Sequence, residues 1–365
     1  MIVKTPGNRS KPLYQYVADD IVAKIEGGFW QPGSKLPSER ALCDQYSVSQ
    51  ITVRRALREL THLGRVYSHH GLGWFVNREA QGGATQEVTL ILSDLDWAAR
   101  PVLRALIEGL DAGRTALRLA FTDWNPQSEA QALQQAIGRG TDGIMLVVTG
   151  EERTLTARYN ELLQDVSVPA LLLWHEVKDA NYPSVAIDEG LCMQTMTRHL
   201  LDLGHQRIAY AGSNPALVEG QRRYWGFATT LWEHGIDLPL SWVLATELNS
   251  EAETRRLQQI FQGPERPTAL VCASDDYAAK AMAILHRLEL RCPEDVAVVG
   301  LGDRDFAPLL PVPLTTFRYD LAKMGAAAAA MILDLLAGRP VKDMRLSGQV
   351  ITRQSCGTSY PRALR

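Results

Sequence analysis

The chain has 365 residues, with 38 basic and 41 acidic side chains and a net charge of −3 at neutral pH. This length is enough for two or three domains that each bury a hydrophobic core. The five cysteines lie far apart with no CxxC pair, which argues against a zinc ribbon and a disulfide scaffold (Cys43, Cys192, Cys272, Cys292, Cys356). No apolar run approaches the ~18 residues of a membrane span, and the first ten residues lack the apolar segment of a signal peptide. We therefore expect a cytoplasmic protein with reduced thiols and no membrane partner.

The charge is unevenly distributed along the chain. Residues 1–78 contain 11 Lys and Arg against 6 Asp and Glu, a net charge of +5, whereas the remainder carries −8. A basic N-terminal part followed by an acidic remainder fits a nucleic-acid contact made by the N-terminal part alone.

The segment Lys35–Leu63 predicts two short helices joined by a tight turn. Ser38 and Ser49 are placed to cap them, because a serine hydroxyl accepts a hydrogen bond from an unpaired N–H of the first turn. On the second helix, apolar residues at helical spacing can face a core (Val53, Ala56, Leu57, Leu60), and polar or basic residues take the other sides (Gln50, Thr52, Arg54, Arg55, Arg58). A bracing helix, a turn and a helix with a basic face form the helix-turn-helix arrangement that fits a major groove.

The flanking segments extend this pattern. Upstream, Tyr14–Ile25 is amphipathic; downstream, Gly64–Val76 alternates and turns at Gly71-Leu72-Gly73 like a small hairpin wing. Residues 11–77 resemble the winged-helix domain of the GntR family of bacterial regulators, on the strings PGSKLPSER (Pro32–Arg40), VSQITVRRAL (Val48–Leu57), the helix end Leu60–Gly64 and HHGLGWFV (His69–Val76). We expect residues 1–77 to form this domain, residues 78–86 a polar linker, and residues 87–365 an effector-binding and dimerisation domain.

The resemblance implies which residues of the first domain contact DNA. Arg40 is implied as a base or phosphate contact, while Gln50, Thr52 and Arg54 lie at the start of the recognition helix, where groove contacts concentrate. Family members commonly have Arg where this chain has Gln50, a departure compatible with an adenine preference rather than the usual guanine contact. His70 and Gly71 at the wing tip are expected in the adjacent minor groove.

Two of these assignments leave alternatives open. Arg54 can instead form a salt bridge with Glu59 or remain solvated, and His70 can simply cap its own turn.

From Glu87 onward, short apolar runs alternate with amphipathic helices, which predicts an α/β fold with doubly wound parallel sheets. Ten or so strands over about 270 residues exceed one comfortable sheet, so we expect two α/β lobes. The expected strands are Val88–Leu92, Leu117–Phe121, Gly143–Val148, Ala170–Trp174, Ser184–Ile187, Arg207–Ala211, Trp242–Thr246, Ala269–Ala273, Val296–Gly300 and Leu314–Phe317. The segment after Leu314 offers material to cross between the lobes.

This second part is similar to the effector domain of LacI-type repressors and the periplasmic sugar-binding fold. The matching strings are TDGI (Thr141–Ile144), VAID (Val185–Asp188), HLLDLGHQRIAYAG (His199–Gly212), RYWGF (Arg223–Phe227), RPTALVCASDDYAAKA (Arg266–Ala281), CPEDVAVVGLGD (Cys292–Asp303) and PVPLTTFRYD (Pro311–Asp320). The resemblance implies two lobes with a ligand between them, and usually a dimer. Because the LacI head and hinge helix are absent, the whole chain resembles the arabinose-repressor type of GntR regulator.

Candidate effector contacts follow from the strand order, because small molecules bind beyond the carboxyl ends of strands in open α/β folds. A sugar needs polar side chains for its hydroxyls and an aromatic face for its C–H side. The candidates are Asp94 and Trp97 after the first strand, Asp123 and Trp124 after the second, Trp174 and His175 at the end of the fourth, Glu219 and Arg223 at the start of a helix, and Asp275. The alternative for each tryptophan is core packing.

The resemblance singles out Arg223 and Asp275 as polar ligand contacts. A third usual contact falls at Gly302, so that either Asp303 substitutes for it or the site binds fewer hydroxyls. Asp188 and Asp276 are expected as helix caps.

The sequence contains none of the GxGxxG, Walker, GxSxG or HExxH motifs, so we expect no enzyme, no cofactor and no metal site. The expected partners are a pseudo-palindromic double-stranded DNA operator, a small-molecule effector that is a sugar or sugar derivative, and a second copy of the chain. Two alternatives remain: a regulator of nucleoside or other metabolism, and a ligand-sensing module whose head binds protein rather than DNA.

Overall fold

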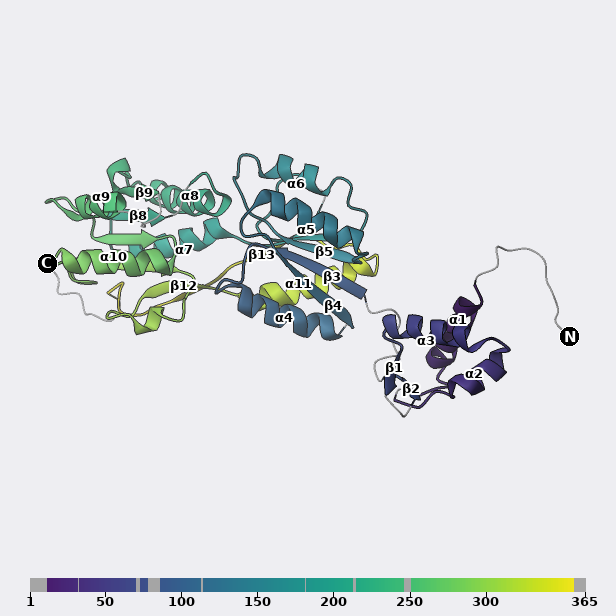
Figure 1. Ribbon diagram of the computed structural model, residues 1–365. Helices are drawn as coiled ribbons and strands as arrows, with labels where there is room; N and C mark the ends of the chain where they lie inside the picture. The colour runs from purple at the N-terminus through teal and green to yellow at the C-terminus, as the bar shows by residue number, and fades with distance from the viewer. Residues whose placement is uncertain are drawn as a thin grey trace. The chain divides into compact units, whose positions relative to one another are not determined.

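The computed structural model describes residues 12–31, 33–69, 73–77, 86–112, 114–180, 182–212, 215–245 and 251–357. The chain divides into two compact units, Met1–Thr85 and Gln86–Arg365, which we name the head and the body (Figure 1). None of the helices in these described ranges combines the length and apolar character that a membrane crossing requires.

The head is a three-helix unit with a two-stranded hairpin: α1 (Leu13–Glu26), α2 (Glu39–Tyr46), α3 (Gln50–His62), β1 (Val66–His69) and β2 (Gly73–Val76). As predicted, Ser38 caps α2 by accepting from the N–H of Ala41, and Ser49 caps α3 by accepting from that of Thr52. The four predicted core positions of α3 are fully buried against α1 (Val53, Ala56, Leu57, Leu60). The tip of the hairpin with His70 and Gly71, and residues 78–85 of the predicted linker, lie outside the described residues.

The first lobe of the body has a six-stranded sheet of order β13-β7-β6-β5-β3-β4, in which every strand pair is parallel. Its elements are β3 (Gln86–Leu92), α4 (Ala99–Ala112), β4 (Thr115–Phe121), α5 (Pro126–Gly138), β5 (Gly143–Val147), α6 (Leu155–Leu163), β6 (Ala170–Trp174), β7 (Ser184–Ile187), α11 (Leu321–Leu336) and β13 (Met344–Leu346). Alternate strand residues point to opposite faces. Leu90 therefore packs with α4 and α11, whereas Ile91 packs with α5 and α6.

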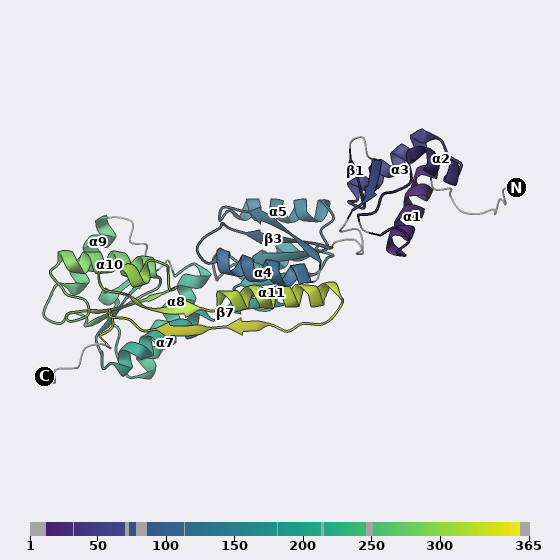
Figure 2. The same ribbon diagram turned by 90° about the horizontal axis from the view of Figure 1, so that it is seen from below.

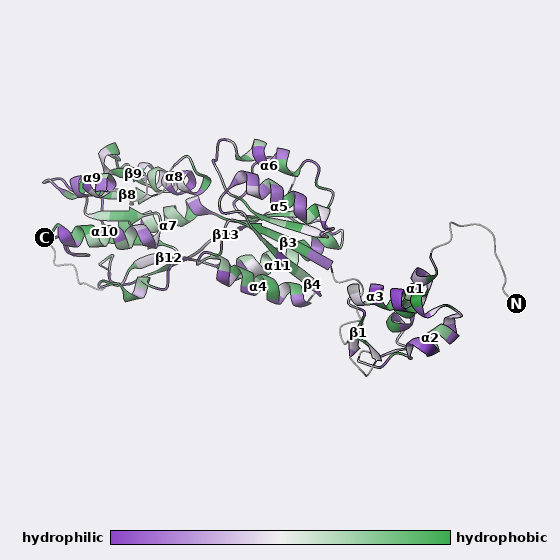
Figure 3. Ribbon diagram, in the orientation of Figure 1, coloured by the Kyte–Doolittle hydropathy of each residue, from purple (hydrophilic) through white to green (hydrophobic). Residues whose placement is uncertain are grey.

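The second lobe repeats this plan with the strand order β14-β12-β11-β10-β8-β9. Its elements are α7 (Glu189–Asp202), β8 (Ile208–Gly212), α8 (Val218–Glu233), β9 (Val243–Ala245), α9 (Glu251–Phe261), β10 (Ala269–Cys272), α10 (Asp275–Arg287), β11 (Ala297–Leu301), β12 (Thr315–Tyr319) and β14 (Gly348–Ile351), with the short 3-10 helices Leu240–Trp242 and Ala307–Leu309. The helices α7 and α8 cover one face and α9 and α10 the other. Figure 3 shows the hydrophobic strands between more hydrophilic helices. The strand β14, which the sequence did not predict, runs antiparallel to β12.

The chain crosses between the lobes three times, from β7 to α7, from β12 to α11 and from β13 to β14. Backbone hydrogen bonds join the crossings: the N–H of Asp188 donates to the carbonyl oxygen of Leu346 (2.9 Å), and that of Asp320 to the carbonyl oxygen of Ser347 (3.3 Å). Asp188 caps α7 as predicted. The prediction that Asp276 is a cap is wrong: Ser274 caps α10, and Asp276 binds Arg304 instead.

The helices α4 and α11 run side by side on one face of the first sheet (Figure 2). Two glycines permit their close approach. A Cβ on Gly325 would overlap the carbonyl oxygen of Val102, and one on Gly109 would lie 2.5 Å from the Cβ of Ala329. Any larger residue therefore has to separate the helices that support the first lobe.

We predict that Gly325→Ala lowers the free energy of unfolding of the body by about 1–3 kcal/mol, the usual effect of overpacking a tight interior. The matched control is Gly138→Ala at the end of α5, where an added Cβ meets nothing within 4 Å. The control is expected to be neutral or slightly stabilising. Urea unfolding of the full chain measures both, and equal midpoints for the two variants would contradict the packing argument.

Candidate functional site

On the head, the first turns of α2 and α3 are joined through one carboxylate. Glu39 Oε2 accepts from Arg54 Nε (2.8 Å) and from Gln50 Nε2 (3.0 Å). Its other oxygen accepts from the indole N–H of Trp74 in the hairpin (3.4 Å). Although partial burial opposes the charged form, these three donors and the charge of Arg54 together lower the pKa of Glu39. Glu39 thus connects the bracing helix, the recognition helix and the wing.

Arg54 forms a salt bridge, but with a different partner from the one expected. Arg54 pairs with Glu39 of α2, not with Glu59 of its own helix. Its side chain remains 57% exposed, and the contact uses Nε, so that neither terminal amino group forms a hydrogen bond within the described part of the chain. Arg40 and Gln50 are also exposed, and Thr52 is half-buried beside Ser49.

In the body, a cavity of about 260 Å³ lies between the two lobes at the carboxyl ends of the strands. Seven of the nine candidate effector residues line it: Asp94, Trp97, Trp124, Trp174, His175, Glu219 and Arg223. Asp123 and Asp275 do not. The rest of the lining is largely aliphatic, from strand ends and from α4 and α11.

Aromatic rings from both lobes meet at this cavity. Tyr319, the last residue of β12, stacks on Trp97 with ring centroids 6.3 Å apart and lies edge-on to Trp174 at 6.2 Å. Trp124 is anchored by its indole N–H, which donates to Asp94 (3.2 Å). Flat rings of this kind can accept the C–H face of a ligand.

The backbone at Trp174 is strained. Its φ is +76°, and the N–H of His175 donates back to the carbonyl of Leu173 (3.0 Å), which closes a three-residue turn. For a large side chain this conformation costs free energy and occurs mostly at functional sites. The turn directs Trp174 and His175 to the cavity at the end of β6.

Behind the cavity lies a buried ion pair. Arg223 donates from Nε and Nη2 to the two oxygens of Glu189 (2.8 and 2.9 Å), and from Nη1 to the carbonyl of Ala273 (3.2 Å). The hydroxyl of Tyr319 donates to Glu189 (2.9 Å). Although burial opposes the charged form, the charge and hydrogen bonds of Arg223 outweigh it and lower the pKa of Glu189.

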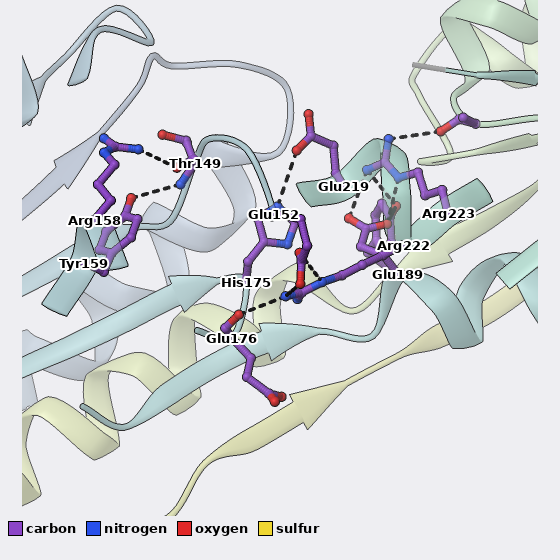
Figure 4. Close-up of polar contacts among 12 residues, drawn as sticks. Thr149, Glu152, Arg158, Tyr159, His175, Glu176, Glu189, Glu219, Arg222 and Arg223 are labelled. Carbon is purple, nitrogen blue, oxygen red and sulfur yellow. Dashed lines mark hydrogen bonds and ion pairs between the residues drawn. The ribbon is translucent and has the colours of Figure 1, made fainter. Parts of the chain in front are cut away.

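His175 and Glu219 form the polar corner of the cavity (Figure 4). His175 is only 3% exposed, and burial lowers its pKa from 6.5 to about 3, so the imidazole is neutral. Its Nε2 lies 3.9 Å from Glu219, and its Nδ1 has no hydrogen-bond partner among the described residues. Burial raises the pKa of Glu219.

A second polar layer surrounds this corner and joins the lobes. Arg222 of α8 binds both oxygens of Glu152 (3.0 and 3.1 Å) and the carbonyl of Glu176 (3.0 Å), which belong to the first lobe (Figure 4). Nearby, the hydroxyl of Tyr159 accepts from the N–H of Thr149, a cavity residue (3.0 Å).

Asp275 does not lie at the cavity surface. It is fully buried, where its carboxylate accepts from Thr316 Oγ1 (2.5 Å) and from the N–H of Arg304 (2.7 Å). Asp303 does not compensate for Gly302 either, because its oxygens bind Arg318 and Arg353 (2.6 Å each). The space beside Gly302 is taken by Trp97, whose ring carbons would lie 3.2 Å from an added Cβ.

Sequence reasoning missed Glu39, Glu189 and Tyr319. Each had a local signal: Glu39 begins a helix directly after its cap, Glu189 follows the cap Asp188, and Tyr319 ends a strand at a crossing. Their partners are distant in the sequence, and only the fold brings them together.

Comparison with known proteins agrees with this architecture. Residues 13–76 match the bacterial regulatory proteins of the gntR family, and residues 197–356 match the periplasmic binding protein-like domain. The chain joins a GntR-type head to a periplasmic-binding-protein-like body. This combination is that of a DNA-binding transcription regulator with an effector domain.

Two similar relatives span nearly the whole chain. The arabinose metabolism transcriptional repressor of Geobacillus stearothermophilus is 28% identical over 353 residues, covering 94% of this chain and 96% of the relative. The repressor of the same name from Halalkalibacterium halodurans is 29% identical over 334 residues, covering 88% and 89%. Among solved structures, a LacI family transcriptional regulator from Mycobacterium smegmatis superposes with a TM-score of 0.63 at 27% identity, over 73% of this chain and 98% of that one.

The buried neutral His175 makes a prediction about pH. Because the pKa of His175 is about 3 in the folded chain and 6.5 ordinarily, the unfolded chain binds a proton at pH values where the folded chain does not. The contribution of His175 to the free energy of unfolding is therefore complete above pH 6.5 and is lost as the pH falls toward 3. Between pH 7 and pH 5, the wild type should lose up to about 2 kcal/mol more than His175→Gln. Urea unfolding at the two pH values measures this difference, and parallel losses would show that His175 is not the titrating group.

Proposed function

We propose that this protein is a dimeric repressor of carbohydrate-use genes that acts in the cytoplasm and binds its effector between the two lobes of the body. The observation that carries the proposal is the cavity at the carboxyl ends of both sheets, with aromatic walls and a polar corner. The repressors of arabinose metabolism that resemble the chain along nearly its full length support a sugar or sugar derivative as the effector.

In the proposal, residues 1–77 bind the operator, and residues 87–365 bind the effector and dimerise. Residues 78–86 are the linker between these two domains. Arg40, Gln50, Thr52 and Arg54 contact the major groove, and His70 and Gly71 the minor groove. Glu39 supports this role, because it fixes Arg54 through Nε and leaves the terminal amino groups to bind a guanine edge or a phosphate. Two heads related by a two-fold axis bind two half-sites that are spaced by the helical repeat.

The effector acts through the lobes. A ligand can change operator affinity only if it binds the DNA-competent and incompetent arrangements with different affinity. The composition of the cavity supports such a difference, because Trp97, Trp124 and Trp174 come from the first lobe while Glu219, Arg223 and Tyr319 come from the second. A bound sugar therefore stabilises one relative position of the lobes.

For the DNA side, we predict that Arg54→Ala weakens operator binding by about 1–3 kcal/mol and reduces its salt dependence. The operator is first enriched from a random duplex library with the full chain, and affinity is then measured by fluorescence anisotropy at several salt concentrations. Arg104→Ala is the control, because Arg104 is an exposed arginine of the body that pairs with Glu108. Failure to enrich any duplex would favour the alternative that the head binds a protein.

For the effector side, thermal unfolding is measured with L-arabinose, other sugars, polyols and nucleosides. A ligand that binds only the folded state at a hundredfold excess over its Kd stabilises it by about 2.7 kcal/mol. The same ligand should alter operator affinity in the anisotropy assay. If only nucleosides raise the unfolding temperature, the proposed mechanism still holds, but the regulated genes are then those of nucleoside metabolism.

A further inference from the structure

The cavity has an excess of carboxylates. Asp94, Asp96 and Glu219 all line it. Arg223 is the single basic side chain that remains charged among the described residues of its lining, because His175 is neutral.

Arg223 is not available to neutralise a ligand. Its guanidinium is already bound at two points by the buried Glu189, so the pair carries no net charge. Ala273 takes one further N–H and the Tyr319 oxygen lies 3.5 Å from Nη2. What Arg223 can offer to the cavity is a remaining hydrogen-bond donor, which suits a hydroxyl.

The neighbouring arginines are neutralised in the same way. Arg222 binds Glu152, and Arg304, which lies over the ring of Trp97 (5.3 Å), binds Asp276. Neither of them lines the cavity. An anionic ligand would therefore meet carboxylates without an unpaired cation, and like charges brought together in a site weaken binding.

Asp94 and Glu219 are placed to set this preference. Asp94 accepts from Trp124 and is otherwise exposed, while Glu219 has no ion pair among the described residues except the long contact to the neutral His175. Asp96 differs, because one of its oxygens accepts from the N–H groups of Ala98 and Ala99 at the start of α4.

We propose that Asp94 and Glu219 make the effector cavity selective for uncharged polyhydroxy compounds, admitting ammonium-bearing analogues and excluding carboxylates and phosphates. The inference rests on the proposed effector function and adds the charge class of the ligand. The hydroxyls meet Glu219, Asp94 and the free donor of Arg223, and the C–H face meets the tryptophan rings. Sugar acids and sugar phosphates are then poor effectors even when their ring has the right stereochemistry.

The test compares ligands that differ in a single group. Isothermal titration calorimetry on the full chain uses L-arabinose and two hexose series. The galactose and the glucose series each contain the neutral sugar, the amino sugar, the uronate and the 6-phosphate. We expect the uronate and phosphate to bind at least about tenfold more weakly than the neutral sugar, and the amino sugar to keep its affinity. In Glu219→Gln, and in the exposed variant Asp94→Asn, the ratio of neutral to anionic affinity should narrow at least about threefold. Glu233→Gln is the matched control, because Glu233 ends the same helix as Glu219 and pairs with Arg198.

Each outcome decides the matter. A uronate or phosphate that binds as tightly as its neutral partner overturns the selectivity while leaving the effector function in place. A ratio that is unchanged in both variants overturns the assignment to Asp94 and Glu219. If no member of either charge class binds, the proposed sugar effector fails and this inference fails with it.

Discussion

The buried pair of Arg223 and Glu189 is the interaction on which the body depends most. Glu189 is the first residue after one crossing, Tyr319 the last before another, and Arg223 comes from α8, so the pair fixes three elements at the junction of the lobes. Burying two charges costs several kcal/mol of desolvation. Here the cost is offset by the two-point geometry, by the Tyr319 hydroxyl, and by the position of Glu189 in the first turn of α7, where the helix dipole favours an anion. The result is a polar wall whose two charges are satisfied within the body.

The head uses the same chemical pair in a different setting. Glu39 holds Arg54 as Glu189 holds Arg223, but the side chains of the head pair are 23% and 57% exposed, against 0% and 15% in the body. An exposed pair contributes at most about 1 kcal/mol and exchanges readily for another anion. This exposure is compatible with the proposed contact of Arg54 with a phosphate or base, whereas Arg223 is enclosed by the body. The same carboxylate–arginine pair thus leaves the arginine accessible where it is exposed, in the head, and removes its charge from the surroundings where it is buried, in the body.

The sequence is most informative where the determinants are local. Short apolar runs predict the ten strands from β3 to β12, and the residue types at Ser38, Ser49 and Asp188 predict caps, because strands and caps depend on neighbouring residues. The rule that ligands bind at strand ends placed Asp94, Trp97, Trp174, Glu219 and Arg223 together.

What could not be predicted involves partners distant in the sequence. The direction of β14 is set by its pairing with β12, and Asp275 is withdrawn from the cavity by Thr316 and the backbone of Arg304. The departure at Gly302 is explained only by the ring of Trp97, which comes from the other lobe and fills the vacant volume. This ring also stacks on Tyr319, so a ligand that displaces or covers Trp97 changes a contact between the lobes as well as its own surroundings. The proposed ligand contact and the contact between the lobes thus involve the same side chain, and the absence of a side chain at Gly302 leaves room for its ring.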